Sequence, residues 1–121
     1  MRISERLVDD VAVVDVSGKL ALADVPGRLK EKISALLYNG HRQIVINLAG
    51  VNYVDSSGLG ELVACHLTAV RHNAAIRIAN TGTRTRELLM LTKLNSVFDT
   101  YPSEKAAIAS FRPRLALAVS H

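Results

Sequence analysis

Between residue 43 and about residue 72, a strand pattern is followed by a short polar segment and then by a helical pattern. This order limits the folds that the chain can adopt. Residues 43–48, Gln-Ile-Val-Ile-Asn-Leu, are apolar and β-branched, which is typical of a strand buried on both faces. Residues 55–60 then read Asp-Ser-Ser-Gly-Leu-Gly. Beyond them, apolar side chains recur at helical spacing: Leu59, Leu62, Val63, His66, Leu67 and Val70. The pattern predicts a buried strand that passes through a short loop into an amphipathic helix.

The loop at 55–60 places two hydroxyls and a carboxylate at the start of that helix. Small polar residues cap helix N-termini, and the free backbone N–H groups there favour negative charge. A serine at this point can therefore carry a phosphate without breaking the helix, so Ser57 can cap while Ser56 accepts phosphate. The reading in which both serines only cap the helix stays open. We expect Gly58 and Gly60 to let the chain turn tightly and a partner approach.

Before residue 43, the pattern predicts a hairpin and one helix. Strands at 2–7 and 11–16 are joined by a turn at Asp9-Asp10. A helix capped by Asp24 follows and stops at Asn39-Gly40. Its predicted inward face consists of Val25, Leu29, Ile33, Leu36 and Leu37.

After residue 72, we predict a strand at 76–79, a helix capped by Thr83, a brief edge strand at Val97-Phe98 and a last helix from Ser103 to Phe111. The predicted inward residues of the first of these helices are Leu88, Leu91 and Leu94, and those of the second are Ala107, Ile108 and Phe111.

The alternation of strands and helices predicts an α/β fold. Crossover connections make the strands after the hairpin parallel. We expect a single mixed sheet of four or five strands, with an N-terminal antiparallel hairpin and about four helices. One domain spans residues 1–121, with a core over about 3–111 and a short tail at 112–121. Function is expected at the carboxyl ends of the parallel strands, and residues 55–60 follow such an end.

Charge and composition argue against two classes of partner. The net charge is +4, but acidic and basic residues are interspersed and only 4% of residues are aromatic, so we expect no direct nucleic-acid contact. No stretch approaches the ~20 apolar residues that span a bilayer, and the first residues lack the apolar region of a signal peptide. The single cysteine, Cys65, fits a reducing compartment. We expect a cytoplasmic protein with no membrane partner.

The residue pattern also argues against catalysis and metal binding. The segment at 58–60 lacks the lysine and the spacing of a phosphate-binding loop, and no nucleophile elbow or pair of catalytic carboxylates is visible. The histidines show no metal-ligand spacing with one another or with Cys65. We therefore expect no enzyme activity, no cofactor and no metal.

On these residues the chain resembles the STAS domain and, within it, the bacterial anti-sigma-factor antagonists. The resemblance rests on residues 55–60, preceded by Asn52-Tyr53-Val54 and followed by the amphipathic helix. Residues 16–20, 91–94 and 97–98 support it. It covers about residues 3–111 and implies a STAS-like fold. The sequence departs from the antagonist pattern at Lys19 and Ala21, where many antagonists carry acidic residues.

The resemblance implies a phosphorylation switch. Ser56, directly after Asp55, would accept a phosphate from an anti-sigma factor that is also a serine kinase. The unphosphorylated form would bind that kinase and free the sigma factor, and a serine phosphatase would reset the system. The implied partner-binding loop consists of Asp55, Ser57, Gly58, Leu59 and Gly60. The alternative is a STAS scaffold subunit of a larger signalling or lipid-transport assembly with no phospho-switch; a small enzyme or nucleotide-binding domain is a third, less favoured hypothesis.

Overall fold

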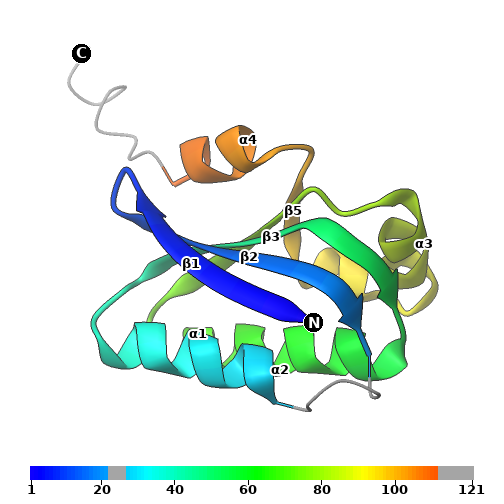
Figure 1. Cartoon of the computed structure of the whole chain (residues 1–121), viewed down its shortest axis with the longest axis horizontal. Coiled ribbons are helices and arrows are strands. Elements are labelled where there is room, and N and C mark those ends of the chain that lie inside the picture. The colour runs from blue at the N-terminus through cyan, green and yellow to red at the C-terminus, as the bar shows by residue number, and fades with distance from the viewer. Residues whose placement is uncertain (22–26, 112–121) are drawn as a thin grey trace.

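Five strands form one sheet in the computed structural model, which describes residues 1–21 and 27–111 (Figure 1). They are β1 (Arg2–Val8), β2 (Val11–Leu20), β3 (Gln43–Val54), β4 (Ala75–Ala79) and β5 (Asp99–Tyr101). The strands lie in sequence order across the sheet. β1 is antiparallel to β2, and the later neighbours are parallel. The predicted mixed sheet with its N-terminal hairpin is confirmed.

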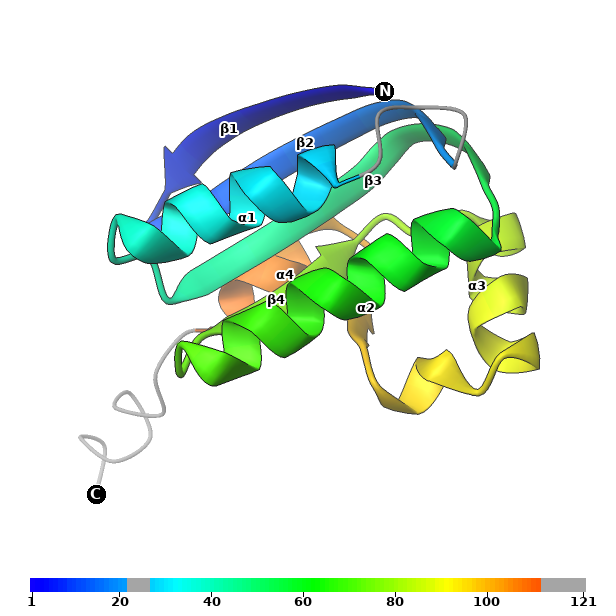
Figure 2. The ribbon, with the colours of Figure 1, turned by 90° about the horizontal axis from the view of Figure 1, so that it is seen from below.

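Helices cover both faces of this sheet (Figures 1 and 2). The helices of the described residues are α1 (Arg28–Tyr38), α2 (Ser56–Arg71), α3 (Thr83–Leu91), the 3-10 helix η1 (Leu94–Ser96) and α4 (Glu104–Ala109). The larger apolar core lies between the sheet and the pair α1 and α2, and a smaller one lies beneath α4 on the opposite face. Within the described ranges, no helix is long and apolar enough to cross a membrane.

The central strand β3 is buried on both faces, as its composition predicts. Ile44 and Ile46 belong to the larger core, whereas Val45 between them belongs to the smaller one. The strand continues past the predicted end at Leu48 to Val54, because its second half pairs with β2 through a shifted register. Glycine and asparagine in that half are weak strand formers, so the sequence pattern did not reveal the extension. The extension carries the chain to the carboxyl edge of the sheet.

The N-terminal half otherwise follows the prediction. The Asp9-Asp10 turn joins the hairpin, with both residues at positive φ. Helix α1 ends at its C-cap Asn39, followed by Gly40 at φ 95°. The helix begins at Arg28, and the predicted cap Asp24 lies outside the described residues, as does Val25. The remaining predicted inward residues are all buried: Leu29, Ile33, Leu36 and Leu37.

The predicted apolar face of α2 is wrong in part. Leu59 and Leu62 are buried, but Leu67 is 47% exposed and Val70 is 54% exposed. The face that packs inward includes small side chains instead, namely Cys65, Thr68 and Ala69. Small residues allow the helix backbone to approach its neighbours closely. Close packing therefore determines which side of α2 faces inward, and the positions of the large apolar residues alone do not.

The predictions for α3 need two corrections. Gly82 occupies the N-cap position without a side-chain hydrogen bond, and Thr83 is the first helical residue, so Thr83 is not the cap. Of the predicted inward residues, Leu88 and Leu94 are partly buried against the larger core, but Leu91 is 79% exposed. The fully buried leucine of α3 is Leu89, which is 2% exposed. Because α3 is short and has leucines on several faces, periodicity does not show which face is buried. Tertiary packing determines that face.

The predicted edge strand at Val97-Phe98 is also misplaced. Phe98 is buried in the larger core, and the strand that pairs with β4 is β5, directly after it. The turn before it begins at Lys93 with a positive φ of 64° and continues through η1. The predicted last helix is confirmed as α4, with Ser103 as its N-cap.

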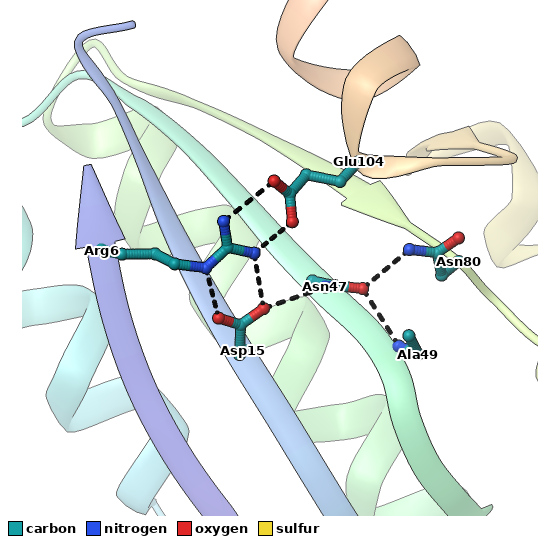
Figure 3. Close-up of polar contacts among 6 residues, drawn as sticks. All are labelled: Arg6, Asp15, Asn47, Ala49, Asn80 and Glu104. Atoms are coloured by element: carbon teal, nitrogen blue, oxygen red, sulfur yellow. Dashed lines mark hydrogen bonds and ion pairs between the residues drawn. The ribbon is translucent and has the colours of Figure 1, made fainter. Parts of the chain in front are cut away.

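A polar network fastens α4 to the hairpin on the face away from α1 and α2 (Figure 3). The Arg6 guanidinium donates hydrogen bonds to two carboxylates. Its Nε lies 2.7 Å from Asp15 Oδ2, and its terminal nitrogens donate to Glu104. Asn47 Nδ2 donates to Asp15 Oδ1 at 2.9 Å, and Asn80 Nδ2 donates to Asn47 Oδ1 at 2.9 Å. Hydrogen bonds from Arg6 hold the pKa of Asp15 below its ordinary value. The network therefore joins strands β1 to β3 and the end of β4 to the helix.

Candidate functional site

The segment at 55–60 forms the junction between β3 and α2, at the carboxyl edge of the sheet. Asp55 is the N-cap of α2, and its Oδ1 accepts a hydrogen bond from the Gly58 backbone N–H at 2.9 Å. Its own N–H donates to the Leu20 carbonyl at 3.3 Å, which fastens the junction to the end of β2. The prediction that Ser57 caps the helix is therefore wrong, because the residue before Ser56 already fills that position.

Both serines lie in the first turn of α2 and are exposed. Ser56 is the first helical residue, and neither hydroxyl makes a hydrogen bond within the described residues. The first backbone N–H groups of a helix carry a partial positive charge, so this end of α2 favours an anion. The helix is already capped by Asp55, which leaves the Ser56 hydroxyl available for reaction.

The predicted partner-binding loop divides into exposed and buried residues. Gly58 and Leu59 are buried and position the loop, whereas Gly60 is exposed like the two serines. A Cβ on Gly58 would stand 2.0 Å from the Leu20 carbonyl oxygen, so only glycine lets α2 come this close to β2. At Gly60, by contrast, a Cβ would meet nothing within 4 Å.

Glu61, which the sequence pattern did not single out, fastens α1 to the same end of α2. Its carboxylate accepts hydrogen bonds from the backbone N–H groups of Gly27 at 3.1 Å, Leu29 at 2.6 Å and Lys30 at 3.2 Å. Helix α1 has no side-chain cap of its own, so Glu61 satisfies its first turn from outside. The one sequence signal was that Glu61 is the only acidic residue in α2.

Removing this external cap should destabilise the fold. We expect Glu61→Ala to lower the free energy of unfolding by about 1–3 kcal/mol, because the first N–H groups of α1, two of them in partly buried hydrogen bonds, lose a charged acceptor. Glu61→Gln should cost less, since its amide oxygen still accepts. Urea denaturation measures both, with the exposed Glu87→Gln as control, and hydrogen exchange should rise in the first turn of α1. Equal denaturation midpoints for Glu61→Ala and the unsubstituted chain would contradict this role.

Exposed apolar side chains lie on α3 and near the end of β3. Figures 1 and 2 both place α3 beside the end of α2 that carries the junction. Two large apolar side chains of α3 are exposed, Met90 at 66% and Leu91 at 79%. Tyr53, two residues before the cap, is 48% exposed. Exposed apolar side chains of this kind are common at protein–protein contact sites.

In residues 1–21 and 27–111, the other reactive side chains show no arrangement for catalysis. Burial raises the pKa of the Cys65 thiol to about 12, so the nucleophilic thiolate is suppressed. The His66 ring packs edge-on against Phe98 with 5.8 Å between ring centroids, so its role is a packing contact. Among the described residues, no group of three or more His, Cys, Asp or Glu side chains could hold a metal ion.

The chain is similar to known proteins over most of its length. The model of the STAS domain matches residues 2–107. The anti-sigma-B factor antagonist of Staphylococcus aureus strain NCTC 8325 / PS 47 is 31% identical over 84 residues, which cover 69% of this chain and 77% of that protein. The Staphylococcus epidermidis anti-sigma-B factor antagonist is 30% identical over 89 residues, covering 74% and 82%.

Solved structures of anti-sigma factor antagonists have a fold similar to that of this chain. An anti-sigma factor antagonist from Mycobacterium paratuberculosis superimposes with a TM-score of 0.81 at 28% identity, covering 93% of this chain and 94% of that one. SpoIIAA, solved in its unphosphorylated form, matches with a TM-score of 0.64 at 19% identity, covering 92% and 98%. The phosphorylated form of SpoIIAA from Bacillus matches with 0.63 at 20% identity, covering 92% and 100%. At these identities the SpoIIAA likeness concerns the fold alone.

Proposed function

Because this chain belongs to the STAS domain family, we propose that it is an anti-sigma-factor antagonist whose phosphoacceptor is Ser56. The observation that carries the proposal is the position of Ser56. It is exposed, it opens α2, and it does not serve as the cap. Relatives at about 30% identity bear the name anti-sigma-B factor antagonist.

In this proposal the chain is a binder and a substrate, and it is not itself an enzyme. The unphosphorylated form binds an anti-sigma factor that is also a serine kinase, and this binding frees the sigma factor in the cytoplasm. Transfer of a phosphoryl group from ATP to Ser56 ends the binding, and a serine phosphatase restores it. The exposed side chains Met90 and Leu91 would add apolar contact area on α3, the helix beside the start of α2.

The local structure supports a phosphate that leaves the fold in place. A phosphoserine carries about −1.5 to −2 charges at pH 7. The N–H groups at the start of α2 favour this charge by about 0.3–1 kcal/mol, whereas the nearby Asp55 carboxylate opposes it. The two effects are similar in size and opposite in sign. Since Asp55 caps the helix, the reaction at Ser56 removes no hydrogen bond from it.

Labelling tests the proposal directly. The anti-sigma factor of the same organism, purified and supplied with radiolabelled ATP, should add one phosphate to the chain. Ser56→Ala should abolish the label, and Ser57→Ala, the matched control one residue along the same turn, should retain it. Intact-mass and peptide mass spectrometry locate the phosphate. Label on Ser57 would refute the assignment, and absence of any label would favour a scaffold role without a switch.

A further inference from the structure

Gly60 is a glycine that the fold does not require. Its backbone is not in the left-handed region, and a Cβ there would meet nothing within 4 Å. It is exposed inside α2, where glycine is less favourable than alanine. Gly58, two residues earlier, is different, because the Leu20 carbonyl leaves no room for a Cβ there. Packing within the domain therefore does not explain why position 60 is a glycine.

The position of Gly60 relative to Ser56 suggests that reason. Residues four apart lie on the same side of a helix, one turn from each other. Helical Cα–Cβ bonds tilt toward the N-terminus, so a side chain covers the turn before its own Cα. Any side chain at position 60 would thus extend over the turn that carries Ser56. With glycine there, the approach to the Ser56 hydroxyl along α2 is open.

We infer that Gly60 is a specificity-determining residue for phosphorylation: its missing side chain is the space in which the kinase docks to reach Ser56. This rests on the proposed function. In the reaction, a bond forms between Ser56 Oγ and the γ-phosphorus of ATP as the bond to the β–γ bridging oxygen breaks. ADP leaves, and the hydroxyl proton passes to the kinase. Gly60 takes no part in these steps and acts only by admitting the partner.

Two substitutions at Gly60 separate docking from folding. Gly60→Ala should raise the melting temperature by roughly 2–4 °C, because alanine favours the helix. Gly60→Leu should keep the circular dichroism of the unsubstituted chain. With the same anti-sigma factor kinase and ATP, Gly60→Leu should lower kcat/KM for labelling at least tenfold, mainly through KM, and Gly60→Ala should lower it less. The control is Ala109→Leu, which places a leucine side chain at an exposed position of α4 and should be labelled normally.

The outcomes distinguish this inference from the proposed function. If Gly60→Leu folds and is labelled as efficiently as the unsubstituted chain, Gly60 does not determine access, while Ser56 remains the acceptor. A lower melting temperature for Gly60→Ala would also overturn the inference, since the fold would then need the glycine. Absence of label on the unsubstituted chain would overturn both.

Discussion

Gly58→Ala is expected to destabilise the domain by about 3 kcal/mol or more. The new Cβ would stand 2.0 Å from the carbonyl oxygen of Leu20 and 2.7 Å from its carbonyl carbon. Both are backbone atoms, which cannot rotate away as a side chain can. Helix α2 would have to move off β2, which would break the hydrogen bond from the Asp55 N–H to Leu20 and loosen the packing of the buried Leu59.

Urea denaturation followed by circular dichroism measures this effect, and Gly60→Ala is its matched control. The two variants have the same composition and differ by two positions in one helix, yet the predicted effects have opposite signs. Gly60→Ala should raise the denaturation midpoint and Gly58→Ala should lower it strongly. An unchanged midpoint for Gly58→Ala would contradict the close approach of α2 to β2.

The junction between β3 and α2 could be predicted because its signals are local. A run of β-branched residues, a cluster of small polar residues and a helical period follow one another directly in the sequence, so each limits the next. The inward face of α1 was predictable for the same reason, since its apolar residues keep one period over three turns. The Asp9-Asp10 turn likewise lies between two clear strands.

The remaining features depend on contacts between distant segments. Glu61 caps α1 across more than thirty residues of sequence, as the hydrogen bond to the Gly27 N–H shows. The hydrogen bonds between Arg6 and Glu104 join segments that are 98 residues apart in the sequence. A helical period cannot reveal such pairs, because it reports only on neighbours along the chain. The rotation of α2 toward Cys65 and away from Leu67 depends in the same way on the shape of the neighbouring surface.

Phosphorylation of Ser56 is expected to weaken binding to the anti-sigma factor kinase at least about 100-fold, which equals roughly 2.7 kcal/mol. In the free protein the added charge is exposed to water and faces the start of α2. In the complex the same charge would be desolvated against the partner, at a cost of several kcal/mol unless it is paired there. Ser56→Asp should reproduce the loss in part, because it adds one charge. Asn73→Asp, at the other end of α2, also adds one charge and should bind normally.

The most direct test is a titration of the kinase with the unmodified and the phosphorylated chain, alongside the melting temperature of each. The account predicts that the two forms melt within a few degrees of each other, while the phosphorylated form binds at least 100-fold more weakly. Equal dissociation constants for the two forms, or unfolding of the phosphorylated chain, would contradict a local electrostatic switch at Ser56.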